Sequence, residues 1–222
     1  MRRPASCLAK AMALSVSLLP LISALSNTTV LPLPADCSSY PDYDNTTGIA
    51  GPWTIVADST DKPIDGFGAD TVFAIAANGL SWGFFTVKTT KPLNQTSMRC
   101  TNSTLQAHLP RYPNGTIWKE VIAAGTPAEE AIGFGFPDLP DPTLTILPYA
   151  HIVDGVRQPD VFLGALNVTT WGYNYQNNTE GGEYYYMRLL TPGSESPSTG
   201  ERLNEGEFEG FIRVDSNATT VI

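Results

Sequence analysis

Two glutamates near the end of the chain, Glu207 and Glu209, have the spacing that comes nearest to enzymatic chemistry. Side chains two residues apart on a β-strand point to the same face of the sheet. With a third acid opposite, such a pair could supply the acid and the nucleophile of glycoside cleavage. The alternation of this segment favours another interpretation, in which Glu207, Glu209 and Arg213 form a solvated outer face.

A dense aromatic run, Trp171-Gly172-Tyr173-Asn174-Tyr175, suggests carbohydrate binding instead. Tyrosine and tryptophan rings combine an apolar face, on which a sugar can stack, with a polar group for its hydroxyls. In an extended segment Trp171, Tyr173 and Tyr175 share one face, with Asn174 on the other. We therefore consider Trp171, Tyr173 and Tyr175 a candidate carbohydrate-binding surface, with Asn174 offering hydrogen bonds. The alternative is that the three rings belong to the core, and their burial decides between the two.

The sequence contains few other residues suited to catalysis or metal binding. Its two histidines, His108 and His151, belong to no zinc-binding motif, and no Gly-x-Ser-x-Gly elbow is present. We expect both to be structural and expect no catalytic residue, metal or cofactor. Asp58, Asp61 and Asp65 lack the spacing of an EF-hand loop, and they fit turn chemistry as well as a calcium site.

The N-terminal segment predicts secretion. Arg2, Arg3 and Lys10 precede an apolar stretch, residues 11–25, and Ala24-Leu25-Ser26 has the small side chains of a signal-peptidase site. We predict a signal peptide over residues 1–26. The apolar stretch is too short for a spanning helix, so we expect a soluble extracellular or cell-wall protein without membrane insertion.

Glycosylation signals are dense in this chain. Eight Asn-x-Ser/Thr sequons occur, and none has proline in the middle position. Together with a signal peptide they indicate a eukaryotic secretory glycoprotein. Every asparagine that carries a glycan must face water. The predicted N-glycosylation sites are Asn27, Asn45, Asn94, Asn102, Asn114, Asn167, Asn177 and Asn217.

Charge and cysteine content fit the same compartment. Removal of the signal peptide leaves 10 basic against 22 acidic residues, a net charge of −12. A chain this acidic lacks the positive surface that nucleic acid requires, so we expect no nucleic-acid partner. Cleavage also removes Cys7, and an oxidising compartment favours a disulfide between Cys37 and Cys100.

The elements that position these residues are predicted to be short β-strands. Runs of β-branched and aromatic residues recur between Gly, Pro, Asn and Asp. The expected strands are Trp53–Ala57, Thr71–Ala77, Trp82–Lys88, Thr104–His108, Ile117–Ile122, Thr143–Tyr149, Val161–Thr169, Glu183–Leu190 and Glu207–Val214.

This pattern predicts an all-β fold, an antiparallel β-sandwich or jelly roll with very little helix. The one helix start signal is the capping box Thr126-Pro127-Ala128-Glu129, with Gly133 ending the helix within two turns. We expect residues 27–50 to be an extended arm tied down by Cys37, followed by a single β-sandwich domain over residues 51–222.

In overall style the chain is similar to secreted glycoproteins of filamentous fungi. Trp53–Asp70, a strand followed by a Pro-Ile-Asp-Gly turn, resembles the start of some fungal cell-wall β proteins. No functional residue is carried over from this resemblance. The sequence therefore predicts a secreted N-glycosylated extracellular or cell-wall protein whose molecular activity it does not name, with an extracellular glycan as the candidate partner. The alternative is a glycoside hydrolase-like enzyme that acts on polysaccharide.

Overall fold

The computed structural model describes residues 27–75, 81–92, 95–111, 114–125, 131–134, 143–178, 182–197 and 199–216. The expected signal peptide (residues 1–26) lies outside these ranges. So do two predicted glycosylation sites, Asn94 and Asn217, and the capping box that begins at Thr126.

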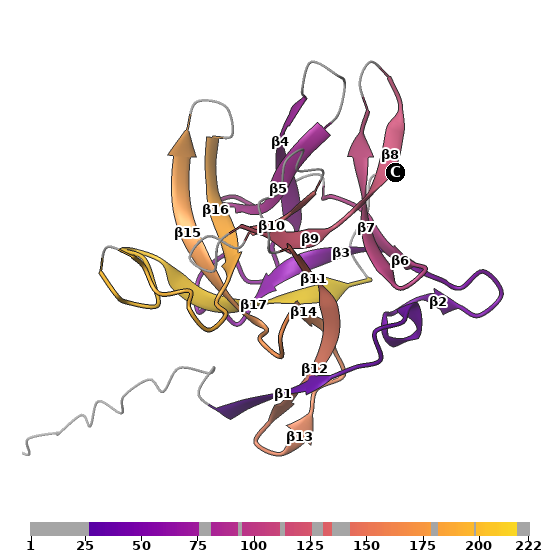
Figure 1. Cartoon of the computed structure of the whole chain (residues 1–222), viewed down its shortest axis with the longest axis horizontal. Helices are drawn as coiled ribbons and strands as arrows, with labels where there is room; N and C mark the ends of the chain where they lie inside the picture. The colour runs from indigo at the N-terminus through magenta and orange to yellow at the C-terminus, as the bar shows by residue number, and fades with distance from the viewer. Residues whose placement is uncertain are drawn as a thin grey trace, which may run out of the picture.

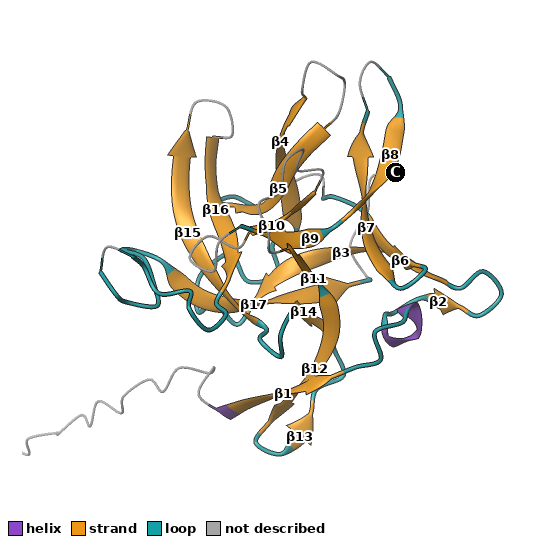
Figure 2. Cartoon of the chain, in the orientation of Figure 1, coloured by secondary structure: helices purple, strands orange, loops and turns teal. Residues whose placement is uncertain are grey.

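The chain folds as an antiparallel all-β protein, which confirms the predicted fold class (Figures 1 and 2). The seventeen strands of the described ranges form one hydrogen-bonded network. The network has two parts, which share one long strand, β3 (Ile49–Asp58). No α-helix occurs in the described ranges, and η2 (Cys37–Ser39) is a 3₁₀ turn.

The smaller part of the network is built on the first half of β3. Ile49 and Ala50 pair with Thr101 and Cys100, and a register shift follows before Trp53 pairs with Met98. The arm contributes a short strand to this sheet. The strands that join β3 in the small sheet are β2 (Tyr43–Asp44), β6 (Met98–Thr101), β7 (Thr104–Pro110) and β8 (Thr116–Glu120).

The larger part begins where the second half of β3 pairs with β17 (Phe208–Asp215). On its other edge β17 pairs with β14 and β15, and from β15 the sheet continues through β16 and β5 to β4. The remaining strands of the large sheet are β1 (Thr28–Pro32), β4 (Ala69–Ile75), β5 (Ser81–Lys88), β9 (Ile122–Ala124), β10 (Ala131–Phe134), β11 (Thr143–Thr145), β12 (Leu147–Val153), β13 (Val156–Arg157), β14 (Phe162–Gly164), β15 (Thr170–Asn178) and β16 (Gly182–Leu189).

One hydrophobic core lies between the two sheets. Its cluster joins Met98, Leu105 and Leu109 of the small sheet to residues of the large sheet such as Phe85 and Met187. Strand alternation produces this arrangement, because β7 buries every second side chain from Leu105 to Leu109. The packing of two sheets through their apolar faces is the architecture of a β-sandwich.

The N-terminal arm is fastened to the fold at two places. β1 pairs along its whole length with β12, from Thr28 opposite Val153 to Pro32 opposite Tyr149. The predicted disulfide is confirmed: Cys37 and Cys100 are bonded, with their Cα atoms 5.3 Å apart. Both cysteines are buried, so the disulfide holds the arm against the core.

Two local predictions were wrong. Ala131–Gly133, expected to end a helix, lies in β10, which pairs with β9, β5 and β16. The predicted strand Val161–Thr169 ends early, because Leu166 and Asn167 have positive φ angles in a tight turn closed by a bridge between Ala165 and Val168. Leu166 lies in this turn and is 62% exposed.

Candidate functional site

The aromatic run on β15 contributes mainly to the core. Trp171 and Tyr173 are 0% exposed. The Trp171 indole donates a hydrogen bond to the Leu163 carbonyl (2.9 Å), and the Tyr173 hydroxyl donates one to the Phe211 carbonyl (2.7 Å). Rings without exposed surface cannot stack on a sugar, so the prediction of a three-ring binding surface was wrong. Trp171 and Tyr173 belong to the core, as the alternative interpretation held. Only Tyr175 reaches the surface, at 44% exposure.

The opposite face of the same hairpin borders a cavity of about 510 Å³, which we call the β15–β16 cavity. Alternation turns Asn174 and Gln176 of β15 into it, and Tyr184, Tyr186 and Arg188 of β16. Its volume lies within the range of small-molecule sites, about 300–1,000 Å³. Small residues at the ends of β9 and β10 leave room for it: Ala124, Gly125 and Ala131.

Aromatic rings form one side of the β15–β16 cavity. Phe84 of β5 meets the Tyr186 ring edge-on, with centroids 5.2 Å apart, and lies 6.3 Å from the Tyr184 ring. Phe84 and Tyr186 are half-buried, whereas Tyr184 is buried. The Lys88 ammonium group lies 5.6 Å from the centre of the Tyr184 ring and covers it. Phe84 and Tyr186 therefore offer the accessible apolar surface.

Side-chain amides lie beside the two tyrosines on the same hairpin face, because Asn174 pairs with Tyr186 and Gln176 with Tyr184. Asn174 and Gln176 are half-buried and lie on one strand, two residues apart. Each amide can donate two hydrogen bonds and accept through its carbonyl oxygen. A third amide, Asn204, comes from the loop before β17. Apolar rings beside neutral amides suit a ligand with both apolar faces and hydroxyl groups.

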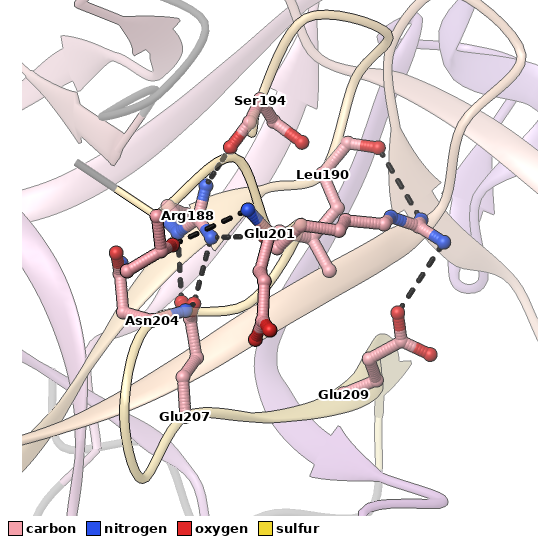
Figure 3. A network of polar contacts seen from close by, with 9 residues as sticks. Arg188, Leu190, Ser194, Glu201, Asn204, Glu207 and Glu209 are labelled. Atoms are coloured by element: carbon pink, nitrogen blue, oxygen red, sulfur yellow. Dashed lines mark hydrogen bonds and ion pairs between the residues drawn. The ribbon is translucent and has the colours of Figure 1, made fainter. Parts of the chain in front are cut away.

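A buried ion pair holds that loop against the sheet. The Arg188 guanidinium donates to both carboxylate oxygens of Glu207, at 2.8 and 2.7 Å, and to the carbonyls of Ser194 and Arg202, at 2.9 and 2.6 Å (Figure 3). The Asn204 backbone amide also donates to Glu207, at 2.7 Å. The contacts of Arg188 with Glu207 and the loop carbonyls thus hold in place the part of the cavity wall to which Asn204 belongs.

The two glutamates singled out for glycoside cleavage are not arranged for it. The Glu207 side chain is 0% exposed and is neutralised by Arg188. Glu209 is partly exposed and pairs with Arg202 at 3.3 Å (Figure 3). The alternative prediction of a solvated outer face was also wrong, because Glu207 is buried and Phe211, on the same face, is 5% exposed. Among the described residues that line the β15–β16 cavity, none is a carboxylic acid.

Gly172 explains how Glu207 reaches Arg188. A Cβ atom at this position of β15 would overlap the Glu207 carboxylate and come within 3.2 Å of Leu190. The missing side chain therefore creates the space in which the buried acid lies. This requirement for glycine could not be recognised from the aromatic run alone.

The histidines take structural positions. His151 is 1% exposed, stacks on Phe162 with centroids 3.6 Å apart, and its Nε2 lies 2.8 Å from the Thr169 hydroxyl. Burial lowers the pKa of His151 to about 4, and Asp58 opposes this shift weakly. His108 stacks on Trp118 on the outer face of the small sheet, with centroids 4.7 Å apart.

The aspartates of the 58–65 loop serve as turn and ion-pair residues. Asp65 accepts hydrogen bonds from the backbone amide and the hydroxyl of Thr60, at 2.9 and 2.7 Å. Asp58 pairs with Arg213 at 2.7 Å. Within the described ranges, no group of three or more His, Cys, Asp or Glu side chains is placed to hold a metal ion.

Six predicted glycosylation sites fall in described ranges, and all six asparagines are exposed: Asn27, Asn45, Asn102, Asn114, Asn167 and Asn177. Asn102 and Asn167 have positive φ angles, which asparagine tolerates in tight turns. In the described part of the chain, no helix is long and apolar enough to cross a membrane.

Comparison with known proteins leaves these residues to be interpreted on their own. No protein-family model matches the sequence, and no curated protein matches it significantly.

Proposed function

We propose that this protein is a secreted, N-glycosylated extracellular or cell-wall protein that binds a saccharide in the β15–β16 cavity. The single observation that carries the proposal is the lining of that cavity of about 510 Å³, where half-buried aromatic rings lie beside side-chain amides. Secretion is supported by the predicted signal peptide, and it agrees with the disulfide between Cys37 and Cys100.

The chemistry of the lining favours a neutral saccharide over a charged ligand. Phe84 and Tyr186 can cover the apolar face of a sugar ring. Asn174 and Gln176 can donate to and accept from its hydroxyls, since each amide does both. Arg188 is the charged residue among the lining side chains described, and its guanidinium is already occupied by Glu207 and two backbone carbonyls.

N-glycosylation is supported by the exposure of the six described sequon asparagines. Asn177 lies next to Gln176 on β15 and, by alternation, on the opposite face of the sheet from the cavity. A glycan at Asn177 would therefore leave the cavity open to a ligand.

The proposal is tested by a glycan array on the secreted protein, followed by calorimetric titration of the best saccharide. Tyr186→Ala removes one wall of the cavity and should weaken binding at least tenfold. Tyr175→Ala is the matched control, because it removes the same side chain from the opposite face of the same hairpin.

We expect Tyr175→Ala to bind the saccharide like the wild type. Equal loss in both variants would place the binding surface elsewhere and contradict the proposed site. Absence of binding to any neutral saccharide on the array would contradict the function itself. Release of reducing sugars from polysaccharide by the protein would instead favour the hydrolase alternative.

A further inference from the structure

A row of aromatic rings runs along the core-facing side of the β15–β16 hairpin and ends at the surface. Tyr173 stacks on Phe208 with centroids 5.6 Å apart, Phe208 meets Tyr185 at 5.2 Å, and Tyr185 meets Tyr175 at 6.0 Å. Exposure rises along this row from 0% at Tyr173 to 44% at Tyr175. Tyr175 is therefore a ring supported on one side and open to solvent.

The open ring lies next to a sequon. Asn177 is two residues after Tyr175 on β15, so both side chains leave the same face of the sheet, about 7 Å apart. The Tyr175 hydroxyl donates to Glu183 at 3.0 Å, and Glu183 is the residue paired with Asn177 across the hairpin. The ring thus leans along the strand toward Asn177.

We infer that Tyr175 is the stacking platform for the first N-acetylglucosamine of a glycan carried by Asn177. A sugar attached to the Asn177 amide nitrogen begins on the same face as the Tyr175 ring, at the strand position toward which that ring leans. Its apolar face can cover the exposed side of Tyr175, while Tyr185 supports the ring from within. The inference rests on the proposed N-glycosylation and adds a glycan-binding residue that acts within the same molecule.

This arrangement accounts for an apolar ring at the surface of the hairpin. Tyr175 is one of five large hydrophobic side chains of the described chain that are exposed. Leu166 is another, and it precedes the sequon asparagine Asn167 directly, with 62% exposure. Leu166 has no ring, and it lies on a turn, where adjacent residues do not share a face. It therefore provides a matched control beside a second glycan.

The test uses the full chain secreted from a eukaryotic host. Mass spectrometry first measures glycan occupancy at Asn177. NMR of the protein with ¹³C-labelled glycans then measures the proton shifts of the first sugar at this site. Ring current should move them upfield in the wild type and in Tyr175→Phe, which keeps the ring, and the displacement should vanish in Tyr175→Ala. Leu166→Ala, the control beside the second glycan, should leave the proton shifts of the first sugar at Asn167 unchanged.

Stability gives an independent readout. Asn177→Gln removes only this glycan, and we expect it to raise the unfolding equilibrium constant about threefold to tenfold when Tyr175 is present. That change corresponds to a loss of about 1–5 °C in Tm. In the Tyr175→Ala background the same substitution should change Tm by less than about 1 °C.

The outcomes separate this inference from the proposed function. An occupied Asn177 whose sugar shows no ring-current shift overturns the stacking and leaves both glycosylation and saccharide binding intact. An unoccupied Asn177 overturns the stacking together with the use of this sequon, and binding in the β15–β16 cavity is still decided by the Tyr186→Ala titration.

Discussion

His151 should make this protein lose stability in mild acid. The imidazole is 1% exposed between Phe162, Phe211 and the Thr169 hydroxyl, and its pKa is lowered to about 4 from an ordinary 6.5. The unfolded chain therefore takes up a proton between pH 6.5 and 4 that the folded protein does not. The contribution of the neutral His151 to the free energy of unfolding is therefore fully present above pH 6.5, and it is lost as the pH falls toward 4.

The size of this effect follows from the shift in pKa. A difference of about 2.5 units corresponds to about 3 kcal/mol once the pH is below both values. Between pH 7.5 and pH 5 the expected loss is about 2 kcal/mol. Asp58 favours the charged imidazolium, but this carboxylate is already paired with Arg213, and its effect is the smaller one.

Urea denaturation at pH 7.5, 6 and 5 measures the loss in the wild type and in His151→Gln. Glutamine has no proton to gain in this range and can still hydrogen-bond Thr169. Carboxylates that titrate in the same window contribute equally to both proteins, so the difference between the two pH profiles isolates His151. Parallel profiles, within about 0.5 kcal/mol, would refute the assignment of a buried neutral imidazole to this position.

Two further predictions concern the links that hold the fold together. Arg188→Leu should lower the free energy of unfolding by about 3–5 kcal/mol, because it leaves the buried Glu207 carboxylate without a partner. Adding Glu207→Gln should recover part of that loss in urea denaturation, and no recovery would argue against an uncompensated charge. Replacing Cys37 and Cys100 by serine should cost about 2–5 kcal/mol by opening a loop of 63 residues, and an unchanged Tm would contradict this.

Strand alternation predicted the fold class well and the surface chemistry poorly. It correctly placed Trp171 and Tyr173 on one face of β15 and Asn174 on the other. It could not tell which face meets the second sheet, because both faces of this hairpin are partly covered. The rings turned out to be core, and the polar face borders the cavity. Tyr184 and Tyr186 on β16 complete that face through cross-strand pairing, which a single strand does not reveal.

Other features depend on contacts between distant segments. The capping box at Thr126 is a local helix signal, yet Ala131–Gly133 completes a sheet between β9, β5 and β16. Tertiary pairing outweighs helix propensity there, since propensity contributes only tenths of a kcal/mol per residue. Glu207 seemed solvated because alternation reports the face of a strand and not the partner that neutralises a charge.

The sharing of β3 between two sheets has a consequence for how the protein comes apart. The first half of β3 is a strand of the small sheet and its second half is a strand of the large sheet. The fully buried Trp53 lies at the junction. If either sheet unfolds, β3 loses part of its hydrogen-bond partners, and the same ten-residue strand also belongs to the other sheet. The strand therefore couples the two layers into one cooperative unit, in which a substitution that destabilises one sheet also destabilises the other.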